Sequence, residues 1–137
     1  MKNNTHPKGK TKPELRMYSL VLYQLSGVQA GIQNSHSMIE YSEQNQDCAT
    51  YKDWAKNHKT VMLMNGGTSE MLNGYAEILE SFGVKYAEFR EPDLGNLITS
   101  VSFIVDASKL NQRAPSVTPS KQCFYTFVAN LDFHGGK

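Results

Sequence analysis

The chain of 137 residues has only two cysteines, Cys48 and Cys123. They lie far apart and match no metal-ligand spacing, so we expect free thiols in a reducing compartment rather than a disulfide framework or a zinc centre. No apolar run is long enough for a signal peptide or a membrane span. These absences favour a cytoplasmic protein that needs no metal or other cofactor and does not enter a membrane.

The chain also lacks a strong overall charge, since its formal net charge is +1. The charge is unevenly distributed, because residues 1–16 hold five basic residues and one acidic residue. This segment has no apolar periodicity and predicts a flexible basic arm. Two interpretations stay open: the arm contacts a nucleic-acid backbone, or it is a solubilising terminus.

Apolar runs and amphipathic segments alternate along the rest of the chain. Strands are predicted at 17–25, 60–64, 84–90 and 97–105, and helices at 28–44, 47–58 and 68–82. Asp47 is expected to cap the second helix and Thr68 or Ser69 the third, which ends at Gly83. This order predicts one α/β domain over 17–107, with a mixed sheet of four core strands and helices on both faces.

Residues 108–137 predict a C-terminal extension. Its first part is polar and reads as a loop, and 134–137 read as a loose end. The apolar run 123–129 predicts a fifth strand or a docking segment, which leaves room for a protein partner that pairs with it by sheet addition.

The helix predicted at 28–44 contains the unusual polar run GIQNSHS. At 100° per residue, one side carries Gln29, Gln33, His36 and Glu40, and the other carries Val28, Gly31, Ile32, Ser35, Met38 and Ile39. We expect the second side to face the sheet, with Gly31 and Ser35 allowing close approach. The polar side offers neutral hydrogen-bonding groups and a titratable histidine at a strand-to-helix corner, where α/β proteins bind ligands. The alternative interpretation is that this polar side of the helix contacts only solvent and has no function.

Glu91 and Asp93 place two carboxylates at the end of the strand predicted at 84–90, in a loop that leads to Asn96 and Thr99. Such a loop can supply a general base or hydrogen bonds to a substrate. An acidic turn is the alternative interpretation.

The run Asn65-Gly66-Gly67 predicts a turn before the third helix. Its N–H groups can in principle hold a phosphate. Because the lysine and spacing of a P-loop are missing, we favour a simple turn followed by a helix cap.

The run Gln33-Asn34-Ser35-His36 after an opening strand resembles the first helix of the archaeal and eukaryotic type of peptidyl-tRNA hydrolases, which carries Gln-Cys-Ser-His. Trp54 on a short second helix, the strand at 60–64 and the Arg90-Glu91 pair follow in the family's order. The resemblance spans roughly 17–107. The loop Glu-Pro-Asp-Leu-Gly-Asn resembles that of phage-encoded members, which implies a viral origin and action in the host cytoplasm.

The resemblance implies cleavage of the ester between a peptide or aminoacyl group and the 3′ end of tRNA, without a metal, by a protein that pairs as a homodimer. It implies that Glu91 activates or orients water, and that Gln33 and His36 position the ester. The substrate-binding residues that it implies are Gln29, Arg90, Asn96 and Thr99.

The chain departs from the family pattern at three places. Gln29 stands where the family has a lysine, Glu91 stands where it has an aspartate, and the family's Asp-Ala-Gly-x-Thr loop is replaced. A neutral amide stabilises an oxyanion less well than lysine does. The departures keep an alternative open: a non-catalytic protein on the same fold that binds a nucleotide, tRNA or a protein partner, as a viral regulator or structural protein.

Overall fold

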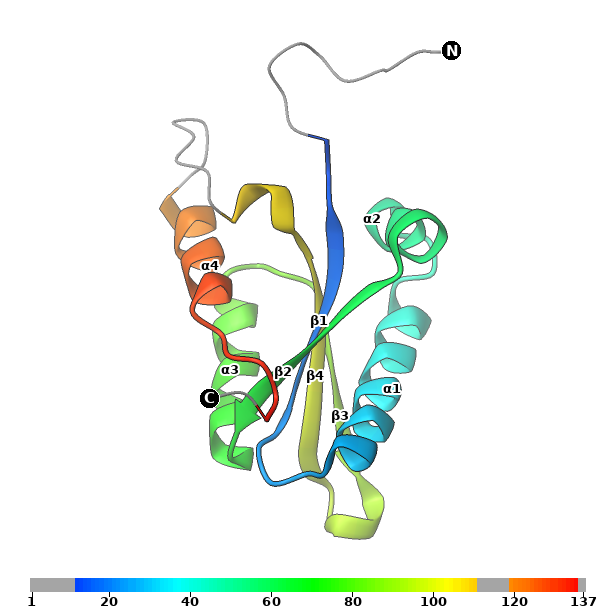
Figure 1. Cartoon of the computed structure of the whole chain (residues 1–137), viewed down its shortest axis with the longest axis vertical. Coiled ribbons are helices and arrows are strands. Elements are labelled where there is room, and N and C mark those ends of the chain that lie inside the picture. The colour runs from blue at the N-terminus through cyan, green and yellow to red at the C-terminus, as the bar shows by residue number, and fades with distance from the viewer. Residues whose placement is uncertain (1–11, 111–118, 136–137) are drawn as a thin grey trace.

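The computed structural model describes residues 12–110 and 119–135 (Figure 1). Along the chain the elements are β1 (Leu15–Leu22), α1 (Gly27–Gln44), α2 (Ala49–Asp53), a π-helical turn (Trp54–His58), β2 (Thr60–Gly67), α3 (Ser69–Ser81), β3 (Tyr86–Glu91), a 3₁₀ turn (Pro92–Leu94), β4 (Leu97–Asp106), a 3₁₀ turn (Ala107–Lys109) and α4 (Pro119–Ala129). No helix among these residues combines the length and apolar character that crossing a bilayer requires.

The four strands form one open sheet in the order β2-β1-β4-β3. β1 pairs with β2 in parallel, and β4 pairs antiparallel with both β1 and β3. The predicted mixed sheet of four core strands is confirmed, and β3 and β4 are antiparallel neighbours. Strands β1, β2 and β3 therefore run in one direction, and their carboxyl ends lie at the same end of the sheet.

Helices cover both faces of the sheet, α1 and α2 one face and α3 and α4 the other (Figure 1). On the α3 side, Phe103 of β4 lies at the centre of the core, stacked on Tyr18 and edge-on to Phe124. A smaller cluster on the α1 side includes Tyr41 and Trp54, and the indole N–H of Trp54 donates to a main-chain oxygen at 2.8 Å. Each face thus has an apolar core of its own.

The predicted boundaries of α3 are confirmed, but the predicted cap of the second helix is wrong. Thr68 accepts a hydrogen bond from the main-chain N–H of Met71, and Gly83 follows the helix with a φ of +72°. The second helix begins after Cys48, which makes no side-chain capping bond, so Asp47 does not cap it.

Two further boundaries differ from prediction. β1 already begins at Leu15, inside the expected arm of residues 1–16. The run 65–67 continues β2 instead of forming a turn, because Gly66 is the extra residue of a β-bulge opposite Val21 and Leu22. The missing side chain matters there, since a Cβ on Gly66 would lie 2.5 Å from Leu72 and 2.9 Å from the carbonyl oxygen of Val21.

The predicted fifth strand at 123–129 is wrong, because this segment belongs to helix α4. Phe124 and Val128 are four residues apart and both are buried in the core on the α3 side, which is a helical spacing. The segment therefore docks on its own sheet instead of extending away from the domain.

Of the predicted loose end at 134–137, the structure describes His134 and Gly135. The prediction is wrong for His134, which is held by hydrogen bonds. The ring Nε2 of His134 lies 2.9 Å from the carbonyl oxygen of Leu25, and its main-chain N–H donates to Leu63. Asn65 donates its N–H to Asp132, and Met64 forms a bridge with Phe133. Residues 132–134 thereby cover the outer edge of β2.

Candidate active site between helix α1 and strands β3 and β4

Helix α1 does not face the sheet with the apolar side that the sequence predicts, and of the predicted polar side only Gln33 is buried. Its buried residues are Ala30, Gln33, Ser37 and Tyr41. Val28, Ile32 and Ile39 are 74%, 43% and 59% exposed, so the predicted orientation of the helix is wrong. Gly31 is not needed for close packing either, since a Cβ there would meet no atom within 4 Å. The cause is the sheet itself, which presents hydroxyl groups of β1 and β4 beneath this part of α1 and so favours polar partners.

A β-bulge in β4 places two consecutive hydroxyl groups under α1. Phe89 of β3 pairs with Ser100 and Arg90 pairs with Ile98, so Thr99 is the extra residue. The hydroxyl of Thr99 donates to Oε1 of Gln33, and the hydroxyl of Ser100 donates to the main-chain oxygen of Gln33 at 2.7 Å. Bulges re-aim side chains in this way, and this bulge fixes both the backbone and the amide of Gln33.

The amide of Gln33 connects these hydroxyls to the predicted carboxylate. Its Nε2 donates to Oε1 of Glu91 at 2.9 Å, and Gln33 is only 5% exposed. Because both ends of the amide are already bonded, Gln33 orients Glu91 instead of reaching out to a ligand. Among the described residues, the second carboxylate oxygen of Glu91 accepts only a long bond of 3.5 Å, from the N–H of Asp93. Glu91 is half-buried, so this oxygen can accept a hydrogen bond from water or substrate.

His36 lies beside this group. Its ring stacks on Phe89 with the centroids 4.5 Å apart and the planes inclined by 26°. Phe89 precedes Glu91 by two residues on β3, and both side chains contact α1. No hydrogen bond between the described residues uses a ring nitrogen of His36, so both nitrogens are left to bind a ligand. The structure therefore brings together four of the predicted site residues: Gln33, His36, Glu91 and Thr99.

The other three predicted site residues lie outside this group. Arg90 points to the α3 side of the sheet, where it donates to Asn73 at 2.9 Å and pairs with Glu88 at 2.7 Å. Asn96 is exposed in the turn before β4 with a φ of +63°. Gln29 is exposed in the first turn of α1, and only its main-chain N–H has a described partner, Ser26.

A chain of three buried hydroxyls continues from the site toward β1, and none of its residues was among the predicted site residues. Ser102 of β4 lies 2.6 Å from Ser19 of β1 and 2.6 Å from Ser37 of α1. The hydroxyl of Ser37 also donates to the carbonyl oxygen of Asn34 at 3.2 Å. We call Ser19, Ser102 and Ser37 the serine chain. The available signal was the pair Ser100 and Ser102, two residues apart in an otherwise apolar strand and therefore on one face.

Comparison with protein-family models gives no match for this chain, and a search among curated proteins gives none. Within the described residues, no three His, Cys, Asp or Glu side chains are grouped so that they can hold a metal ion. The function therefore has to be inferred from the carboxylate, amide, hydroxyl and imidazole groups of the site.

Proposed function

We propose that the protein is an esterase of the peptidyl-tRNA hydrolase type, which hydrolyses the ester between a peptidyl or aminoacyl group and the 3′ end of tRNA. The observation that carries the proposal is the hydrogen-bonded group Thr99–Gln33–Glu91, built from three separate elements, with His36 beside it. These are residues that the family resemblance selects, and the observed order of helices and strands agrees with the order that it implies. The carboxyl end of β3 is also where α/β sheets usually bind ligands.

In the proposed reaction Glu91 is the general base. One of its oxygens is held by Gln33, and the other accepts a proton of the attacking water. The water oxygen forms a bond to the ester carbonyl carbon, and the bond from that carbon to the ribose oxygen then breaks. The proton held by Glu91 passes to the leaving ribose oxygen. His36 hydrogen-bonds the ester or the terminal ribose, and Thr99, which is fully buried, acts only through Gln33.

Gln29 makes this a weaker site than one with lysine at the same position. It is exposed at the start of α1, one helical turn from Gln33, where a cation would stabilise the oxyanion. The basic arm is proposed to hold the RNA backbone. Its residues 1–11 lie outside the described part of the chain, so this role stays a prediction.

The test is hydrolysis of N-acetyl-aminoacyl-tRNA by the purified chain. Glu91→Gln preserves shape but removes the base, and it is expected to lower kcat by about 10²–10⁴-fold, the usual contribution of a general base. Glu43→Gln, an exposed carboxylate of α1 outside the site, is the matched control and should leave kcat unchanged. No turnover by folded wild-type protein would reject the esterase, and turnover that survives Glu91→Gln would reject this site.

Two companion variants define roles within the site. Thr99→Val is nearly isosteric and leaves Oε1 of Gln33 without its buried donor, so kcat should fall while KM changes little, and Thr99→Ser should restore activity. Gln29→Lys should raise kcat if the missing cation limits the reaction. An unchanged rate in Gln29→Lys would mean that another group stabilises the oxyanion.

A second candidate function is a non-catalytic protein that binds tRNA, a nucleotide or a protein partner. It is favoured by the neutral Gln29 and by Val28, Ile32 and Ile39, which lie exposed along the solvent side of α1. The third interpretation, in which 123–129 adds as a strand to a partner's sheet, fails because the segment forms helix α4. Specific tRNA binding without hydrolysis, unaffected by Glu91→Gln, would support the binding protein over the esterase.

A further inference from the structure

The two outer edges of the sheet differ. The edge of β2 is covered by residues 132–134 through main-chain hydrogen bonds to Leu63 and Asn65. In residues 12–110 and 119–135, nothing pairs with the outer edge of β3. A free edge exposes main-chain N–H and C=O groups that can pair with another strand, and proteins usually protect such edges. The exception at β3 therefore needs an explanation.

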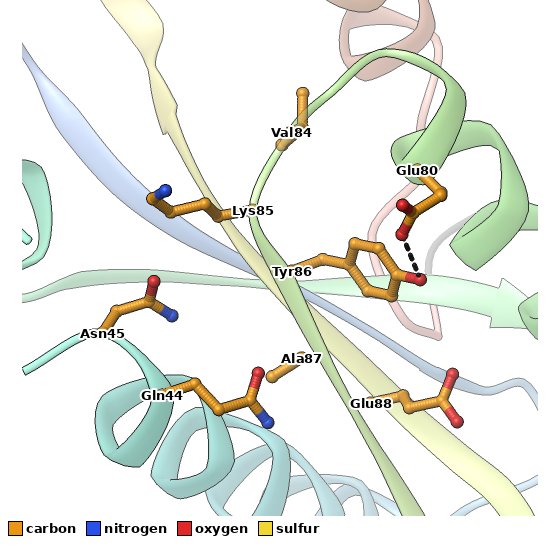
Figure 2. Close-up of a pocket in the computed structure, with 8 residues that line it drawn as sticks. All are labelled: Gln44, Asn45, Glu80, Val84, Lys85, Tyr86, Ala87 and Glu88. Atoms are coloured by element: carbon orange, nitrogen blue, oxygen red, sulfur yellow. Dashed lines mark hydrogen bonds between the residues drawn. The ribbon is translucent and has the colours of Figure 1, made fainter.

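The free edge of β3 lies in a hollow of about 550 Å³. The floor is the run 84–88, and the walls are Gln44 at the end of α1 with Asn45 directly after it, and Glu80 near the end of α3. Figure 2 shows β3 in front, with Gln44 and Asn45 on one side and Glu80 on the other. Ala87, in the middle of this floor, contributes only a methyl group and is itself buried. The shape is that of a trough along a strand edge, which fits one extended segment.

The charges in and beside the trough specify what kind of segment fits. Glu88 and Tyr86 project to the α3 side of β3, and the Tyr86 hydroxyl donates to Glu80 at 3.1 Å. Burial and these neighbouring carboxylates raise the pKa of Tyr86, and Glu77 adds to the same field. Lys85 also lines the trough, and Glu88 already pairs with Arg90 at 2.7 Å, so Glu80 and Glu77 supply the remaining negative charge near Tyr86. The α3 wall is therefore acidic, whereas the α1 wall carries neutral amides.

We propose that the outer edge of β3 is a docking site for an extended segment of a partner protein that carries Lys or Arg at alternate positions. The segment pairs with the main chain of β3 as a fifth strand and directs its basic side chains toward Glu80 and Glu88. Its intervening side chains point to the opposite face, over Ala87 and beside the amides of Gln44 and Asn45. Main-chain pairing supplies affinity, and the alternate charges supply selectivity. The docking site is separate from Glu91 and does not depend on esterase activity.

The test uses a fluorescein-labelled peptide, Thr-Lys-Val-Lys-Val-Lys-Thr, with blocked ends, titrated with the full chain and followed by fluorescence anisotropy. A second peptide with Glu in place of Lys should fail to bind. The double variant Glu80→Lys with Glu88→Lys should weaken binding at least about tenfold, since two attractive contacts become repulsive. Glu70→Lys, on the same helix α3 but outside the trough, is the matched control and should bind like the wild type.

Backbone methylation separates strand pairing from simple charge attraction. In an extended peptide, the N–H groups of the lysines point to one edge and those of the intervening residues point to the other. Methylation of one set should abolish binding and methylation of the other set should preserve it. Equal binding of both methylated peptides, or binding unaffected by the double variant, would overturn the proposal. If the chain sediments as a dimer and the double variant sediments as a monomer, the edge belongs to a second copy, which also overturns the proposal.

Discussion

Replacing Ser102 by alanine tests whether the serine chain is an ordered hydrogen-bond network. The hydroxyl of Ser37 has one proton, which it donates to the carbonyl oxygen of Asn34. Ser102 must then donate to Ser37, and Ser19 must donate to Ser102. With Ser37 donating to Asn34, donation runs from β1 through β4 to α1. Every proton in it has an acceptor, and Ser102 is the only member that both accepts and donates within the chain.

The magnitude follows from this order. Ser102→Ala removes two hydrogen bonds, each with a net contribution of about 1 kcal/mol, and leaves the buried Ser19 hydroxyl without an acceptor, which costs about 1–3 kcal/mol. We therefore expect the free energy of unfolding to fall by roughly 3–5 kcal/mol. Ser19→Ala removes only the first donor and should cost about 1 kcal/mol. The triple alanine variant leaves no orphaned hydroxyl, so it should be more stable than Ser102→Ala alone.

The assay is urea unfolding followed by far-UV circular dichroism, with the midpoint and slope fitted for each variant. The decisive comparison is between the triple variant and Ser102→Ala, because independent contributions would make the triple variant the least stable of all. If the triple variant loses as much stability as the three single variants added together, the hydroxyls are not coupled. The proposed order of donation would then be refuted.

Two further predictions concern backbone packing and pH. Gly66→Ala should destabilise the fold by about 1–3 kcal/mol, because the new Cβ would lie within 3 Å of Leu72 and the backbone of Val21; an unchanged urea midpoint would contradict this. Burial raises the pKa of Tyr41 from 10.0 to about 12. The unfolded chain ionises first, so stability present below pH 10 should be lost as the pH rises toward 12, and Tyr41→Phe should flatten that part of the unfolding curve.

The fold is predicted best where the apolar periodicity of a segment agrees with the capping residues at its ends. Helix α3 has an apolar face, a threonine cap and a glycine after its last turn, and each of these signals acts locally. The strand predicted at 123–129 was wrong because the aromatic and β-branched residues of this segment favour strands by propensity. Its actual conformation is decided by the core, which accepts Phe124 and Val128 from one side of a helix.

The sequence predicts part of the group around Gln33, but it does not predict the orientation of α1. Gln33, Glu91 and Thr99 were selected from short motifs, and the structure joins them by hydrogen bonds. The bulge that turns Thr99 under α1 depends on strand register, which leaves no reliable trace in a single sequence. The orientation of α1 was wrong because the prediction assumed an apolar sheet beneath it, whereas the sheet there carries Ser100 and Ser102.

The polar contact between α1 and the sheet is hard to explain by stability alone. Apolar residues of similar size could fill the same space, since replacing both partners of a buried hydrogen bond is often nearly neutral. Fully bonded polar groups instead allow few alternative positions, because a shift of α1 would leave several of them unpaired. The serine chain holds the middle of α1, and Ser100 and Thr99 hold Gln33 one turn earlier. Glu91 is thus oriented by a side chain that has little freedom to move, which the proposed role of Glu91 in directing a water molecule would require.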